Sequence, residues 1–128
     1  HQDDLEMLDN PQLNLSVYEN PFTVKAPVQS SHEEMKFGDF DVQWLHLPGH
    51  CPGSSMIYLK DENIIFSGDV LFKGSIGRFD FPNSSKYETI ESINKIKEYD
   101  FDAVIYPGHG PNSTLSEERL NNPYLKKS

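Results

Sequence analysis

The stretch that decides the fold is LPGHCPGS, residues 47–54. It follows residues 40–46, where the larger apolar side chains recur at every second position, and this period predicts a β-strand. The Pro48-Gly49 pair ends that strand, so His50 lies in the turn at its end. Loops at strand ends are where rigid scaffolds usually carry chemistry. His50 is therefore the first candidate functional residue.

The same arrangement occurs twice more along the chain. Apolar runs at residues 63–66 and 103–106 enter turns that contain glycine, and Asp69 and His109 lie in those turns. Each turn alone is commonplace, because Pro, Gly and Asp are ordinary turn residues. Two imidazoles and one carboxylate together suit Zn, Fe or Mn. The joint pattern predicts metal ligation by His50, Asp69 and His109.

The rest of the chain predicts a mixed α/β layer. The helix over residues 85–99 begins with a capping box at Ser85 and Glu88, and Thr114 begins a second, shorter one that continues to residue 120. We expect one face of the longer helix to be formed by Tyr87, Ile90, Ile93 and Ile96. The other expected elements are strands over residues 40–46, 55–59, 63–66 and 103–106, a turn at 36–39, and loops over 14–34 and 68–83.

Composition excludes several classes of function. A length of 128 residues with 36% hydrophobic residues suits one folded domain. The formal charge of −9 argues against nucleic acid and against a polybasic membrane-surface role. No apolar run approaches the roughly 20 residues that span a bilayer. The single cysteine, Cys51, excludes an internal disulfide. We expect a cytoplasmic protein.

The sequence gives weaker evidence for a functional role of the other reactive or charged side chains. Cys51 lacks a recognisable nucleophile signature and is read as a small packing residue. Arg78 is a candidate for binding an anionic substrate, and a surface ion pair with Asp80 is the competing interpretation. His46 lies on a predicted strand and is expected to be structural, whereas His32 lies in a polar loop and is expected to be solvated.

Five segments carry a resemblance to one known family. Residues 47–54 resemble the motif around the third metal-binding histidine of metallo-β-lactamase-fold hydrolases, with Cys51 where Thr is more common. Residues 66–69 look like the strand end with the metal-bridging aspartate, and residues 106–111 are similar to the motif of the last metal-binding histidine. Residues 74–80 and 117–125 narrow the resemblance to the glyoxalase II-like (hydroxyacylglutathione hydrolase-like) branch.

The resemblance implies a fold and a reaction. The fold is an αβ/βα sandwich of two similar halves, and its C-terminal half is a mixed sheet with helices packed on one face. Two divalent metals would lie between the halves, Zn first and Fe or Mn as alternatives. His50 and His109 would each bind a different metal, with Asp69 between them. A metal-bound hydroxide would attack the carbonyl of a small thioester substrate.

One part of the family pattern is absent from this sequence. The His-x-His-x-Asp-His motif, which supplies the remaining ligands, does not occur. We therefore expect residues 1–128 to be a single domain that corresponds to the C-terminal half, without the N-terminal half. Alone it would bind metal weakly or not at all and be inactive. A complete site would need the missing half or a neighbouring chain, and the uncovered surface favours association, including a homo-oligomer.

Three functions follow from these observations. The leading one is a metal-dependent thioester hydrolase, of which this chain is one half. The second is a persulfide dioxygenase-like oxidoreductase on the same fold, which uses one iron. The third is a non-catalytic structural or interaction module. Metal analysis with thioester hydrolysis and oxygen uptake measured side by side separates the first two functions, and a zinc titration of the chain alone tests the third.

Overall fold

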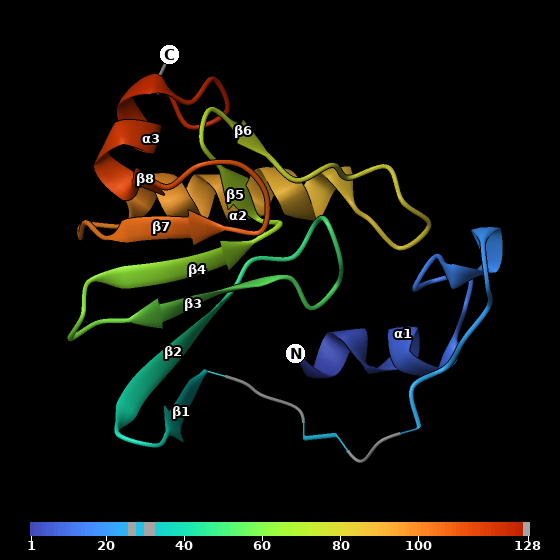
Figure 1. The fold of residues 1–128 in the computed structure, drawn as a ribbon. Coiled ribbons are helices and arrows are strands. Elements are labelled where there is room, and N and C mark those ends of the chain that lie inside the picture. The colour runs from blue at the N-terminus through green and yellow to red at the C-terminus, as the bar shows by residue number, and fades with distance from the viewer. Residues whose placement is uncertain (26–27, 30–32, 127–128) are drawn as a thin grey trace.

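The computed structural model describes residues 1–25, 28–29 and 33–126. Its main element is a six-stranded sheet in the order β1-β2-β3-β4-β7-β8 (Figure 1). These strands are β1 (Glu34–Phe37), β2 (Phe40–His46), β3 (Ser55–Leu59), β4 (Ile64–Gly68), β7 (Val104–Pro107) and β8 (Ser113–Thr114). Only β4 and β7 pair in parallel, and the other neighbours are antiparallel. The sheet is therefore mixed, as the sequence predicts.

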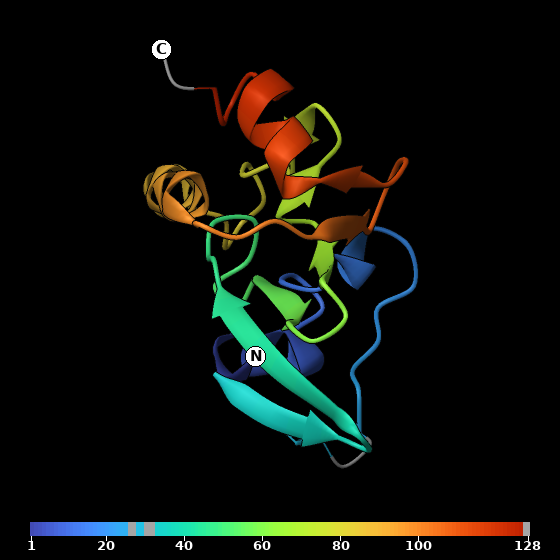
Figure 2. The ribbon, with the colours of Figure 1, turned by 90° about the vertical axis from the view of Figure 1, so that its left-hand side faces the viewer.

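Helices join and cover the strands. The longest, α2 (Lys86–Glu98), lies in the connection between β4 and β7, and α3 (Leu115–Asn121) follows β8. Viewed nearly along its axis, α2 lies on one side of the sheet (Figure 2). A two-stranded hairpin of β5 (Leu71–Phe72) and β6 (Ser75–Ile76) precedes α2. The N-terminal segment holds 3-10 turns at Gln2–Asp4 and Ser16–Tyr18 and the short helix α1 (Leu5–Asp9).

One face of the sheet forms the hydrophobic core. In adjacent strands, Tyr58 is paired with Ile65, and Ile65 with Ile105, so the three share a face. They are nearly inaccessible to solvent and pack with Leu47 and Ile96 in one cluster. Burying such side chains stabilises the fold by about 1.5 to 3 kcal/mol each. This face is the one against which the helices pack.

The opposite face of the sheet is apolar but open. Phe66 is paired with Ile57 in β3 and with Tyr106 in β7, and the Phe66 and Tyr106 rings lie 5.8 Å apart. Phe66 is 45% exposed, and Tyr106 and Val104 are each 38% exposed. A contiguous apolar surface on one sheet face is a feature that soluble proteins usually cover.

The predicted helix starts at Ser85 and Thr114 are confirmed, although the Ser85 amide donates to the Gly49 carbonyl and so does not complete a capping box. The predicted face of the longer helix is right for Ile93 and Ile96 and wrong for Tyr87 and Ile90. Ser85 and Thr114 accept hydrogen bonds from the amides three residues ahead, as capping requires. The buried side of α2 consists of Thr89, Ser92 and Ile96, with Ile93 partly buried. Tyr87 and Ile90 are exposed instead. Residues three positions apart are about 300° apart around a helix, which is about 60° short of a full turn. The four predicted positions are therefore spread around the helix and do not share one face.

Four short strands are not predicted from the sequence. Strand β1 begins at Glu34, inside the segment predicted as loop and turn, and β5 with β6 lies inside the predicted 68–83 loop. Strand β8 is two residues long. The predicted loop over residues 14–34 includes residues 26–27 and 30–32, which lie outside the described part of the chain. The expectation that His32 is solvated therefore stays a prediction. In the described ranges, no helix is both long and apolar enough to span a membrane.

Candidate metal centre

Strand direction brings the three predicted ligands to one edge of the sheet. Strands β2 and β4 both run antiparallel to β3, and β7 runs parallel to β4. The carboxyl ends of β2, β4 and β7 therefore lie at the same edge. His50, Asp69 and His109 follow those three ends. Residues far apart in sequence are thus placed together by topology alone.

The Asp69 carboxylate lies between the two imidazoles. Its Oδ2 is 3.4 Å from His50 Nε2, and its Oδ1 is 3.3 Å from His109 Nε2. The side chain of His50 is 17% exposed and that of His109 is 75% exposed. Among the described residues, these three do not bring all their donor atoms within 4.8 Å of one another. The arrangement suits a carboxylate between two cations better than one cation held by all three.

The tautomer of His50 follows from its second contact. His50 Nδ1 lies 2.7 Å from the carbonyl oxygen of Arg78. A carbonyl only accepts, so Nδ1 carries the proton, and in the neutral ring Nε2 presents a lone pair. That lone pair faces a carboxylate oxygen, which is repulsive unless a proton or a metal cation lies between them. The donor set therefore fits a metal at Nε2, with Arg78 fixing the ring orientation.

Two glycines allow the close approach of these loops. A Cβ on Gly77 would clash with the carbonyl oxygen of Asp69 and lie 3.3 Å from His50 Nδ1. A Cβ on Gly108 would lie 2.7 Å from Asp69 Oδ1. The Gly108 amide also donates to the Gly68 carbonyl at 2.8 Å. Any side chain at either position would displace the aspartate.

The start of α2 holds the His50 loop. Ser84 Oγ donates to the His50 carbonyl at 2.6 Å, and Ser92 Oγ donates to the Pro48 carbonyl at 2.7 Å. The Ser85 amide donates to the Gly49 carbonyl at 2.8 Å. The Ser85 cap is predicted from the sequence, whereas these contacts are not. Nothing in the spacing of the serines signals a partner more than 30 residues away.

The Arg78 side chain is engaged outside the centre. Its Nε and Nη2 donate to the two carboxylate oxygens of Asp80 at 2.6 and 2.8 Å, and its guanidinium lies 4.3 Å from the Phe81 ring centre. These hydrogen bonds hold the pKa of Asp80 below its ordinary value. In the described structure, the main-chain carbonyl of Arg78, rather than its side chain, contacts the centre.

Cys51 has the environment of a packing residue. Burial is the largest cause that raises the pKa of its thiol, and the nearby Asp4 carboxylate raises it further. A nucleophilic cysteine needs the opposite shift, because the thiolate is the reactive form. This supports the interpretation made from the sequence.

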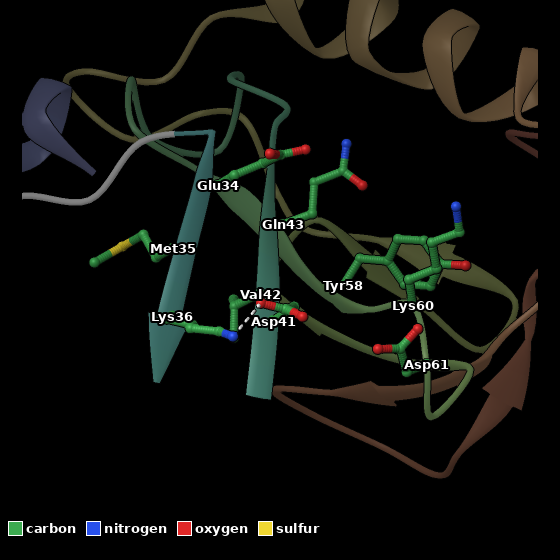
Figure 3. A pocket seen from close by; sticks show the side chains of 9 residues that line it. All are labelled: Glu34, Met35, Lys36, Asp41, Val42, Gln43, Tyr58, Lys60 and Asp61. Carbon is green, nitrogen blue, oxygen red and sulfur yellow. Dashed lines mark ion pairs between the residues drawn. The ribbon is translucent and has the colours of Figure 1, made fainter. Parts of the chain in front are cut away.

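A hollow of about 450 Å³ lies away from the centre. Figure 3 shows charged side chains of both signs around it, among them Lys36 and Asp41, whose ion pair measures 3.5 Å. None of the three predicted ligands lines this hollow. A separate hollow of about 390 Å³ is lined by residues 76–80 and Tyr124, and so adjoins the Arg78 turn.

Comparison with known families identifies the class. The sequence profile described as "Metallo-beta-lactamase superfamily" matches residues 1–109. The chain belongs to the metallo-β-lactamase superfamily, and membership implies a divalent-metal site. A curated relative is "Hydroxyacylglutathione hydrolase GloC" from Haemophilus influenzae, which is 40% identical over 94 residues. That alignment covers 73% of this chain and 44% of the relative.

Solved structures agree with the sequence relatives. The chain is similar to the BLEG-1 B3 metallo-beta-lactamase, with a TM-score of 0.86 and 34% identity over 99% of this chain and 64% of that one. It is also similar to TTHA1623 in a di-iron-bound form, with a TM-score of 0.82 and 33% identity over 98% of this chain and 63% of that one. The chain spans about half the length of the curated relatives it matches.

Proposed function

We propose that His50, Asp69 and His109 are metal ligands of a metal-dependent hydrolase, with the Asp69 carboxylate between two cations. The observation that supports this most strongly is the contact of each Asp69 carboxylate oxygen with a different imidazole Nε2, at 3.4 and 3.3 Å. When bound, such cations lower the pKa of water and polarise a carbonyl group. Zn is the first choice, and Fe is supported by the di-iron form of a similar structure.

Three donors are too few for two cations with four ligands each. We propose that the remaining ligands come from a second half of the domain, which packs on the open apolar face of the sheet around Phe66, Val104 and Tyr106. The exposure of these side chains supports this arrangement. The described chain alone would then hold metal weakly. Residues 1–128 would act as the C-terminal half of one metallo-β-lactamase-like domain.

We propose a small thioester as the substrate of the complete enzyme. The support is the name of the relative GloC, a hydroxyacylglutathione hydrolase, at 40% identity. A hollow of about 390 Å³ is lined by Gly77 and Arg78, whose carbonyl contacts His50, and it offers space for such a molecule. Arg78 would bind an anionic group of the substrate in place of the Asp80 carboxylate, with which it is paired in this structure.

The test compares three substrates on the full-length protein after metal analysis. A hydroxyacylglutathione thioester, a β-lactam and a persulfide with oxygen-uptake recording are offered in parallel. We expect thioester cleavage, a loss of at least about 100-fold in His50→Ala, and little change in Cys51→Ser. Oxygen uptake without thioester cleavage would contradict the hydrolase proposal. Activity that depends on Cys51 more than on His50 would contradict the metal mechanism.

A further inference from the structure

A second group of metal-type donors lies outside the proposed centre. It consists of His1, Asp3 in the first 3-10 turn, and His46 at the end of β2. The imidazoles of His1 and His46 are stacked, with ring centres 4.0 Å apart and planes 11° apart. Each of the three residues offers a donor atom within 4.8 Å of the other two. None of them belongs to the trio of His50, Asp69 and His109.

The distances are close to those of a bound transition metal. Asp3 Oδ2 lies 3.7 Å from His1 Nδ1 and 3.6 Å from His46 Nε2. Donors around a tetrahedral zinc ion, each about 2.0 to 2.1 Å from it, are about 3.3 Å apart. The observed separations exceed that value by a few tenths of an ångström. Rotation of the Asp3 side chain, which is 46% exposed, shortens these separations. The two imidazoles must also turn out of their stack, because each nitrogen lone pair lies in its ring plane and two nearly parallel planes do not converge on one ion.

The surroundings favour a cation and leave it room. The His1 side chain is 7% exposed, whereas His46 is 37% exposed, so the group is partly desolvated. A hollow of about 350 Å³ opens beside it, and Glu33 and Trp44 also line that hollow. The chain carries a formal charge of −9. Partial burial strengthens attraction between a cation and the Asp3 carboxylate.

Two existing hydrogen bonds compete with the metal. His46 Nε2 lies 2.7 Å from the Pro52 carbonyl, and the Asp3 amide donates to His1 Nδ1 at 3.2 Å. A cation at these nitrogens has to displace both contacts, and it has to remove the proton from His46 Nε2. The affinity is therefore expected to be weaker than that of a four-ligand structural zinc site and to fall as pH falls.

We propose that His1, Asp3 and His46 form a second binding site for a divalent cation of the zinc class, separate from the His50, Asp69 and His109 centre. Imidazole nitrogen and carboxylate oxygen suit Zn, Co and Ni rather than Mg or Ca. Its position joins the N-terminal 3-10 turn to the end of β2. An occupied site therefore clamps the N-terminal segment against the strand that leads into the His50 loop.

The test is a zinc titration of the 128-residue chain, followed residue by residue. Imidazole nitrogen resonances of His1, His46, His50 and His109 are recorded by NMR, so that the two sites report separately. We expect zinc-dependent shifts at His1 and His46 that saturate together. We expect Asp3→Asn to raise the apparent dissociation constant of zinc, measured from the His1 and His46 shifts, by about tenfold or more. Asp9→Asn, an exposed carboxylate in α1 with the same charge change, alters it by less than about twofold.

Several results would overturn the proposal. Shifts confined to His50 and His109 would mean that zinc binds only at the other centre. Equal effects of Asp3→Asn and Asp9→Asn would mean that Asp3 is not a ligand. Thermal unfolding with and without zinc tests the remaining alternative, in which Asp3 stabilises the fold but binds no zinc. In that case Asp3→Asn lowers the melting temperature by the same amount in both conditions, and His1 and His46 show no zinc-dependent shift.

Discussion

Substitution Glu118→Ala tests how the fold holds the loop behind His50. Glu118 is 2% exposed, and its carboxylate accepts three hydrogen bonds. The donors are Ser113 Oγ at 2.6 Å, the Gly74 amide at 2.8 Å and Asn122 Nδ2 at 2.8 Å. Gly74 forms the turn of the β5–β6 hairpin, which leads directly to Gly77 and Arg78. The buried carboxylate thus ties α3 to the hairpin.

The expected loss of stability depends on which acceptors remain for each of the three donors after Glu118→Ala. Ser113 Oγ still reaches Glu117 at 3.1 Å, and Asn122 Nδ2 still reaches the carbonyls of Phe72 and Ser75. The Gly74 amide has no other partner among the described residues. Gly74 is exposed, so water can reach its amide after the substitution, and the loss comes from removing the charged acceptor itself. A hydrogen bond to a charged group contributes about 1.5 to 3 kcal/mol, and the vacated volume adds to this. We expect Glu118→Ala to lower the free energy of unfolding by about 2 to 4 kcal/mol.

Urea unfolding of the chain, followed by circular dichroism, measures this loss. Glu117→Ala is the matched control, because Glu117 is exposed on the same helix and makes a single side-chain contact; we expect less than about 1 kcal/mol. Glu118→Gln keeps the shape and should cost less than Glu118→Ala. A loss below about 1 kcal/mol for Glu118→Ala would show that the carboxylate does not hold the hairpin.

Three further predictions concern other parts of the molecule. A hydrogen bond from the Ser116 side chain, together with the amides of Ser116 and Ala103, lowers the pKa of Asp102. The stabilisation by Asp102 is therefore complete above its unfolded pKa of about 3.9 and is lost as pH falls through the lower folded value. In urea unfolding at several pH values, Asp102→Asn should flatten the dependence of stability on pH below about pH 4. By NMR, Arg78→Gln should raise the pKa of Asp80 toward its ordinary value, and an unchanged pKa would contradict the pairing. In urea unfolding, Ile105→Ala in the core should cost about 2 to 5 kcal/mol and Val104→Ala on the open face less than about 1; equal losses would refute the assignment of the two faces.

Local signals in the sequence were sufficient for most regular elements. The alternation in residues 40–46 and the caps at Ser85 and Thr114 act over a few residues, and each corresponds to an observed strand or helix start. The two-residue strands β5, β6 and β8 have no such signal. Their pairing depends on neighbours in space, because a strand of two residues contains one period of the alternation and no repeat of it.

The sequence by itself determined which residues are candidates for the metal centre. Glycine-containing turns after three apolar runs mark His50, Asp69 and His109, and this is a property of neighbouring residues. Only the tertiary structure decided how they meet. The shared direction of β2, β4 and β7 brings them to one edge, and the Arg78 carbonyl sets which nitrogen of His50 faces Asp69. Strand pairing and hydrogen bonding across 28 residues depend on the folded chain, so no local pattern contains them.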